Sequence, residues 1–210
     1  MSRPSQHRAT RRRRGERGAV LVEMTIVFPV LMVISLAILD LGLGWRVNLT
    51  VSNGTRAGAR VASNLGTSTS ADKEALRAVG AALGSIPTAQ VDMVVIFKAD
   101  TAGGTVPTAC TNATAKSNGG SSSSSCNTYT GAEVAAIASG AGPTFGTGCS
   151  TSRDRFWCPA NRVNSQGAVG GPDQVGVYIK VNRVTSTKMF GSTMVIQDTA
   201  VMGIEPGAGS

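Results

Sequence analysis

The sequence has a single histidine, His7, in 210 residues, and this histidine lies among N-terminal arginines. A Ser-His-Asp triad, a Cys-His pair and a histidine-ligated metal site are therefore excluded from the rest of the chain. The sequence also lacks the glycine-rich phosphate loop of nucleotide-binding proteins and the nucleophile elbow of serine hydrolases. We expect a protein that is not an enzyme and that needs no cofactor or metal.

Acidic residues are also few, and beyond residue 90 they are scattered singly. Catalysis by two carboxylates brought together by folding stays open as an alternative. These residues are Asp92, Asp100, Glu133, Asp154, Asp173, Asp198 and Glu205.

Positive charge is concentrated at the N-terminus. Residues 1–17 contain seven arginines and one glutamate, which is +6 of the net charge of +8. Lys and Arg clusters that precede an apolar run keep that end of a membrane protein in the cytoplasm. We interpret this segment as a basic leader, with nucleic-acid binding by the arginines as the less favoured alternative.

An apolar run follows the arginines, from Ala19 to Trp45, and it is interrupted by the acids Glu23 and Asp40. As a helix, these 27 residues would be about 40 Å long, more than the roughly 30 Å of a bilayer's hydrocarbon core. Trp45 and Arg46 are typical of a membrane interface, which places the C-terminal part outside. A cleaved secretory signal is disfavoured because the run is too long and no Ala-x-Ala pattern follows it.

All four cysteines lie on the predicted outer side, at Cys110, Cys126, Cys149 and Cys158. An even number of cysteines in an exported domain indicates two disulfides. Zinc is disfavoured because close C-x₂₋₄-C pairs are absent. Three pairings are open, and we prefer the nearest-neighbour pairing, Cys110 with Cys126 and Cys149 with Cys158.

The helical pattern continues beyond the apolar run. One helical face carries residues spaced alternately four and three apart, which are Val47, Val51, Gly54, Gly58, Val61 and Leu65. The two glycines on this face allow another backbone to approach closely. The face packs on its own domain, on neighbouring subunits, or on both.

The rest of the chain predicts a mixture of helices and strands. We expect a helix over 72–83, capped by Thr69 and Asp72, a strand over 91–98, and a helical turn over 133–139. Residues 100–130, rich in Gly, Ser and Thr, predict a flexible loop clipped by a disulfide. Two strands, over 175–182 and 194–202, predict an antiparallel pair that the strand over 91–98 joins.

A basic and aromatic cluster is formed by Arg153, Arg155, Phe156 and Trp157. Such residues stack on nucleic-acid bases, which would suit a DNA-binding subunit. Packing beside the loop that ends at Cys158 is the interpretation we favour.

Glu23 needs an explanation, because a carboxylate at the centre of a spanning helix costs roughly 2.5–3.5 kcal/mol. If a protease cut after Gly18, the new ammonium of Ala19 would lie one helical turn from Glu23, about 6 Å along the axis. The carboxylate would then pair with its own terminus or with that of a neighbouring subunit. The alternative is that Glu23 extends to the cytoplasmic interface beside Arg17.

This arrangement of leader, glycine, glutamate and apolar helix resembles the type IV pilin superfamily. Within it, the chain resembles TadE-like minor pseudopilins of the tight-adherence (Flp) pilus system. The matching stretches are Arg-Gly-Ala-Val-Leu-Val-Glu at 17–23, Phe-Pro at 28–29, Asn-Gly-Thr-Arg-Ala-Gly-Ala-Arg at 53–60, and the segments 171–178 and 200–206.

The resemblance implies specific roles for several residues. Gly18 and Ala19 would flank the bond cut by a prepilin peptidase, and Glu23 would act in subunit recognition. Pro29, which removes the backbone hydrogen bond to Thr25, would soften the helix. The expected partners are the peptidase, other pilin or pseudopilin subunits, the pilus assembly platform and the membrane, with DNA as a less favoured one.

The expected fold is α+β, with a long N-terminal hydrophobic and amphipathic helix and a small antiparallel-sheet head, as in pilins. We divide the chain into a basic prepilin-type leader at 1–18, a transmembrane helix at 19–45, its continuation at 46–66 and an extracytoplasmic head at 67–206. The protein would cross the inner (cytoplasmic) membrane once, with its N-terminus in the cytoplasm, and support adhesion or surface colonisation. The alternative is an unprocessed membrane anchor that carries an exported domain for binding a surface ligand or DNA.

Overall fold

A long helix leads into the folded part of the chain. The computed structural model describes residues 13–145, 149–188 and 191–206, and the chain divides into Met1–Gly42 and Leu43–Ser210, here called the N-terminal and C-terminal units. Helix α1, Arg13–Leu65, begins in the first unit and ends in the second. It ends where Gly66 adopts a left-handed backbone with φ of 48°, a conformation that glycine tolerates and that commonly terminates helices.

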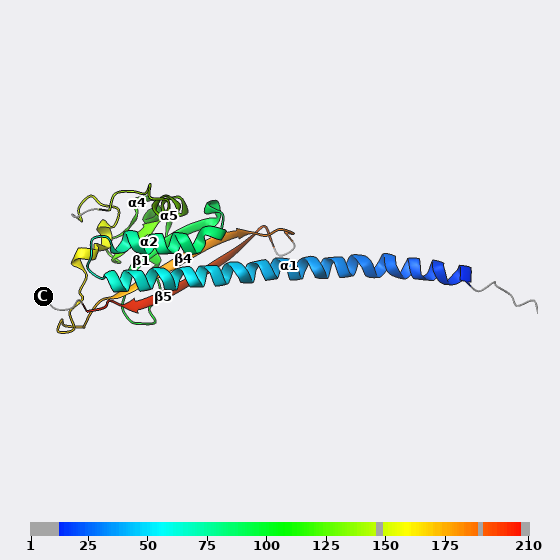
Figure 1. The fold of residues 1–210 in the computed structure, drawn as a ribbon, viewed down its shortest axis with the longest axis horizontal. Coiled ribbons are helices and arrows are strands. Elements are labelled where there is room, and N and C mark those ends of the chain that lie inside the picture. The colour runs from blue at the N-terminus through cyan, green and yellow to red at the C-terminus, as the bar shows by residue number, and fades with distance from the viewer. Residues whose placement is uncertain (1–12, 146–148, 189–190, 207–210) are drawn as a thin grey trace, which may run out of the picture. The chain divides into compact units, whose positions relative to one another are not determined.

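The C-terminal unit contains a five-stranded antiparallel sheet in the order β2-β3-β1-β4-β5. The centre is β1, Val91–Ala99, and β4, Gln174–Val184, pairs with it and with β5, Thr193–Gly203. The other edge is short, with β2, Gly120–Ser121, and β3, Cys126–Tyr129. The β4–β5 hairpin is the pair of long arrows in Figure 1. The predicted α+β class and the antiparallel sheet are confirmed.

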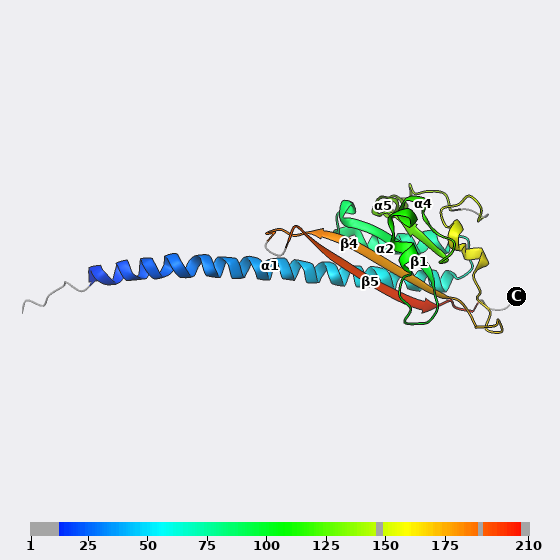
Figure 2. The same cartoon turned by 180° about the vertical axis from the view of Figure 1, so that it is seen from behind.

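Helices cover one face of this sheet. The last turns of α1, helix α2 (Ala71–Ala82) and helix α5 (Gly131–Ala138) enclose a core with the inward residues of β1 and β4. The strands' alternating valines and isoleucines build it, among them Val94, Ile96, Val177 and Ile179, all fully buried. Figure 2 shows β5 and β4 running side by side, with the last turns of α1 behind them.

A smaller core lies on the opposite face of the sheet. It contains Met93, Val95, Phe97 and Tyr178 with both cysteines of one disulfide. Gly176 lies beneath the Phe97 ring, because a Cβ at this position would come within 2.3 Å of Phe97 Cζ. The sheet is thus buried on both sides at its centre.

The predicted flexible loop over 100–130 is wrong in part. This segment contains helix α3, Thr108–Thr111, helix α4, Ala113–Asn118, and strands β2 and β3. The start of α4 has a signal in the sequence, because Asn112 is a residue type that favours helix N-caps. Its side chain accepts a hydrogen bond from the backbone N–H of Ala115 at 2.7 Å.

The predicted cap of α2 is also wrong. The helix begins after Ser70, which makes no side-chain cap bond. Asp72 is instead fully buried, and its carboxylate accepts a hydrogen bond from Arg162, which is far away in the sequence. Three short 3₁₀ turns, Leu83–Ser85, Thr88–Gln90 and Arg155–Trp157, and a fourth at Pro159–Asn161 complete the unit.

Candidate functional site: helix α1

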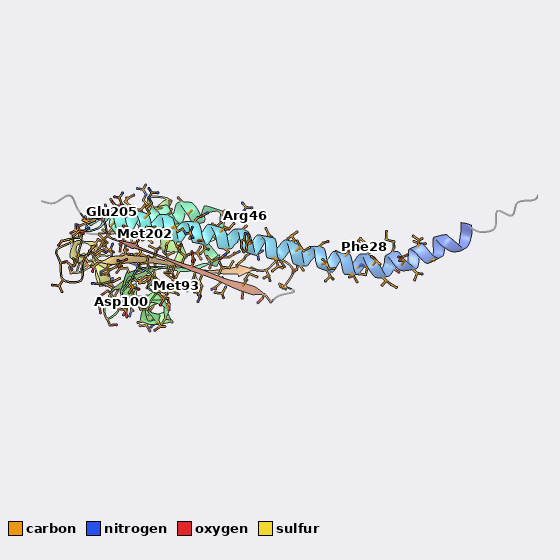
Figure 3. All side chains as sticks on the ribbon, turned by 90° about the horizontal axis from the view of Figure 1, so that it is seen from below. Phe28, Arg46, Met93, Asp100, Met202 and Glu205 are labelled. Carbon is orange, nitrogen blue, oxygen red and sulfur yellow. A yellow bond between two sulfur atoms is a disulfide. The ribbon has the colours of Figure 1, made fainter. Side chains whose placement is uncertain are left out.

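The first part of α1 exposes apolar side chains on all sides. Between Val20 and Ile34 the large hydrophobic residues are 43% to 67% exposed, and Phe28, labelled in Figure 3, is among them. Exposed apolar surface this continuous marks contact with lipid or with another protein. Within the described residues this is the one helix that is long and apolar enough to cross a membrane, starting at Gly18.

The residues predicted for cleavage and for subunit recognition lie on this exposed stretch. Gly18 and Ala19 are helical, and a Cβ built on Gly18 would meet no atom within 4 Å, so the backbone here is open on that side. Glu23 is exposed and stands four residues after Ala19, which places the two on one helical face. Pro29 lies inside the helix, where it removes the bond to the Thr25 carbonyl.

The later part of α1 packs within the C-terminal unit. A Cβ on Gly58 would lie 2.5 Å from Val79 of α2 and 3.3 Å from Val177 of β4, and one on Gly54 would lie 3.2 Å from Ile179. The close approach predicted for these glycines is therefore made by α2 and β4 of the same chain. Thr55 adds a hydrogen bond to the Asp198 carboxylate at 3.0 Å, which ties α1 to β5.

The part of α1 that carries these features also matches a known family. Residues 18–60 fit the family model described as TadE-like protein. Residues 18–60 are TadE-like. The match begins at the glycine of the predicted cleavage site and includes Glu23, Pro29 and the 53–60 block. No curated protein and no solved structure matches the chain.

The match confirms the predicted resemblance over residues 18–60, a part of the chain that holds 43 of its 210 residues. TadE-like proteins are in general not enzymes. Among the residues that the structure describes, no group of three or more His, Cys, Asp or Glu is arranged to hold a metal ion.

Beyond the TadE-like segment, two disulfides join Cys110 to Cys126 and Cys149 to Cys158. This is the pairing that the sequence analysis prefers. Their Cα atoms lie 6.1 and 5.6 Å apart, within the usual range. The first links α3 to β3 in the core beneath the sheet.

The basic and aromatic cluster is occupied by packing. Arg153 Nε lies 2.6 Å from Glu133 Oε1, and its guanidinium stacks on Tyr129 with 5.3 Å to the ring centroid. Trp157 is 7% exposed, and Arg155 stacks on Phe156. Arg153 and Trp157 are thus engaged within the fold, as the packing interpretation expects, whereas Arg155 is exposed and Phe156 is half-buried. Burial raises the pKa of Glu133, but hydrogen bonds from Arg153 and Thr130 outweigh it, and the pKa lies below its ordinary value.

A buried polar network was missed by the sequence analysis. The carboxylate of Asp72 accepts from Arg162 Nη2 at 2.5 Å and from Asn127 Nδ2 at 3.0 Å. Asn127 Oδ1 accepts in turn from the backbone of Phe156 and Trp157 at 3.1 Å. Burial raises the pKa of Asp72 and Arg162 offsets part of this effect. The network joins α2, β3 and the 155–162 turns, far apart in sequence.

Most of the scattered carboxylates serve as structural partners. Asp92 pairs with Lys116 at 2.5 Å and with Lys180 at 3.1 Å. Asp173 pairs with Lys98 at 2.7 Å and accepts from the Val163 backbone. These acids hold strands and connections together, and their partners are cations and amides, as expected for structural ion pairs.

Proposed function

We propose that this chain is a minor pilin-like subunit that takes part in the assembly of a tight-adherence (Flp-type) pilus. The observation that carries the proposal is the exposed apolar start of α1, which bears a glutamate five residues after a glycine and lies in the TadE-like segment. An exposed apolar helix needs either lipid or the helices of other subunits around it. A pilus subunit meets both surroundings, lipid before assembly and neighbouring helices after it.

Processing between Gly18 and Ala19 by a prepilin peptidase is part of this proposal. Residues 1–17 would hold the unprocessed N-terminus in the cytoplasm through their arginines, with a single pass through the inner membrane and the C-terminal unit outside. Removing residues 1–18 discards a net charge of +6 and leaves one ammonium beside Glu23. Extraction of the helix from the bilayer then costs less, because fewer charges are anchored in the headgroups.

Glu23 and Pro29 take separate roles in the proposal. The Glu23 carboxylate pairs with the new N-terminus of its own or an adjacent subunit, which matches helices in register. Pro29 leaves the Thr25 carbonyl without its α-helical donor, so the helix bends more easily there as it leaves the bilayer. The partners are other pilin or pseudopilin subunits, the assembly platform and the membrane, and the assembled pilus supports adhesion or surface colonisation.

Intact-mass measurement of the membrane-extracted protein tests this function, in cells with and without their prepilin peptidase. We expect a mass that begins at Ala19 in peptidase-positive cells and the full chain in peptidase-negative cells. The full-length mass in both strains would overturn the proposal in favour of an unprocessed anchor that carries a ligand-binding domain.

A further inference from the structure

A groove lies in the C-terminal unit beside the first residues that follow the apolar run. Its volume is about 240 Å³, and three segments line it: the turn of α1 around Arg46, the connection around Ile86 and Pro87, and the end of β4 around Arg183. The apolar part of the wall comes from Leu43 and Val47 of α1 with Ile86 and Pro87.

The groove is cationic on one side and apolar on the other. Arg46 is exposed, and none of the ion pairs found among the described residues involves it. Arg183 also lies in the wall, but it is 5% exposed and has a partner of its own, so the accessible guanidinium of the groove is that of Arg46. The residues that line the groove include no Asp or Glu. A guanidinium beside apolar surface suits a phosphate that is esterified to an apolar group.

The position of Arg46 along α1 indicates that the phosphate belongs to a lipid headgroup. The run from Ala19 to Gly44 is about 39 Å of helix, longer than the hydrocarbon core, so Arg46 emerges at the headgroup layer if α1 spans the membrane. The neighbouring Trp45 is 67% exposed, as expected of an interfacial tryptophan. Arg46 and its turn of α1 are labelled in Figure 3, where Met202 and Glu205 lie at the other end of the unit.

We propose that this groove binds the headgroup phosphate of an anionic phospholipid from the outer leaflet, with Arg46 as the phosphate ligand and Leu43 and Val47 against the glycerol and first acyl carbons. The proposal rests on the membrane-spanning α1 of the proposed function. An anionic headgroup is favoured over a zwitterionic one because the lining offers no carboxylate to pair with a headgroup ammonium. The bound lipid would hold the C-terminal unit at the bilayer surface until the subunit is extracted.

The test is native mass spectrometry of the full chain, extracted in mild detergent and incubated with equal amounts of phosphatidylglycerol and phosphatidylcholine. We expect the wild type to retain phosphatidylglycerol over phosphatidylcholine, and Arg46→Gln to retain about tenfold less, since a charge-assisted contact is lost. Arg60→Gln is the matched control, because Arg60 is an exposed arginine of the same helix outside the groove.

Two results would overturn the proposal. One is equal retention of the two lipids by the wild type. The other is an equal loss of phosphatidylglycerol in Arg46→Gln and Arg60→Gln, which would indicate attraction of the lipid to positive charge anywhere on the helix. Circular dichroism of both variants checks that they fold, as substitution of exposed arginines should allow. The outcome is separable from that of the proposed function, because processing at Gly18 is read by intact mass and does not depend on which lipid is retained.

Discussion

Arg162 Nη2 lies 2.5 Å from Asp72 Oδ1, although 90 residues separate the two in sequence. Both side chains are fully buried. Because each charge depends on the other in a medium that solvates neither, the loss of one partner costs far more than the pair contributes.

Arg162→Met should therefore lower the free energy of unfolding by about 3–5 kcal/mol, since it leaves the Asp72 carboxyl buried without its cation. Chemical denaturation of the full chain in detergent, followed by circular dichroism, measures this. Arg77→Met is the matched control, because Arg77 pairs with Glu74 at 3.4 Å on the surface and should cost about 0.5 kcal/mol or less. Adding Asp72→Asn to Arg162→Met should recover part of the loss. An Arg162→Met protein as stable as the control would contradict the role given to the pair.

Glu133 predicts a pH dependence of stability. Burial raises its pKa, but hydrogen bonds from Arg153 and Thr130 outweigh burial and hold the pKa below the ordinary 4.5. A carboxyl whose pKa is depressed by folding stabilises the fold above its unfolded pKa, and this contribution disappears as the pH falls through the folded value.

The difference in melting temperature between the wild type and Glu133→Gln should thus be largest near neutral pH and should narrow below 4.5. The raised pKa of Asp72 acts in the opposite direction, but it is present in both proteins and cancels in the difference. Thermal unfolding in buffers between about pH 3 and 7 makes the measurement. A difference that stays constant over this range would show that the Arg153–Glu133 pair does not act through charge.

The fold was predictable where a repeated pattern carries the signal. The apolar run, the 4-3 spacing from Val47 to Leu65 and the alternating valines of β4 each repeat over many residues, and they indicated the helix and the hairpin. The 100–130 segment was read as a loop because its short helices and strands are stabilised by caps, the sheet edge and a disulfide rather than by periodicity.

The site was predictable only in part, for a physical reason. Gly18, Glu23 and Pro29 are local features of one helix, and their spacing is visible in the sequence. The pairing of Asp72 with Arg162 depends on contacts between segments that lie far apart in sequence, and Asp72 at a helix start has an equally good local explanation as a cap. The groove at Arg46 was hidden for the same reason, because its wall comes from three separate segments.

Gly58 should tolerate no larger residue. A Cβ there would lie 2.5 Å from Val79, so Gly58→Ala should lower the free energy of unfolding by about 1–3 kcal/mol through overpacking, despite alanine's better helix propensity. Gly42→Ala is the control, because a Cβ at Gly42 would meet nothing within 4 Å. Chemical denaturation of both variants in detergent measures their free energies of unfolding. Equal values for Gly58→Ala and Gly42→Ala would contradict the tight packing of α1 against Val79 of α2.

The disulfide between Cys110 and Cys126 should contribute about 3 kcal/mol, since it closes a loop of 16 residues that would otherwise be free in the unfolded chain. Replacing both cysteines with serine removes it. Thiol titration of unreduced, denatured wild type should find no free thiol, and two free thiols in the wild type would contradict the pairing. The double variant should unfold at lower denaturant, with the Cys149–Cys158 bond retained.

Glu23→Ala should impair assembly while it leaves membrane insertion and processing intact. Insertion should become easier, because a carboxylate leaves the apolar segment, and the scissile bond after Gly18 is unchanged. What is lost is the partner for the N-terminal ammonium of the same or a neighbouring subunit.

Co-purification of the Glu23→Ala variant with its pilus partners measures this loss of assembly. Met24→Ala is the control, because Met24 is the adjacent, exposed and uncharged residue. Glu23→Asp should recover part of the binding, since it keeps the charge on a shorter side chain. If Glu23→Ala retained its partners as well as Met24→Ala, the carboxylate would have no part in subunit recognition, and its place in the helix would be explained by its nearness to the cytoplasmic interface.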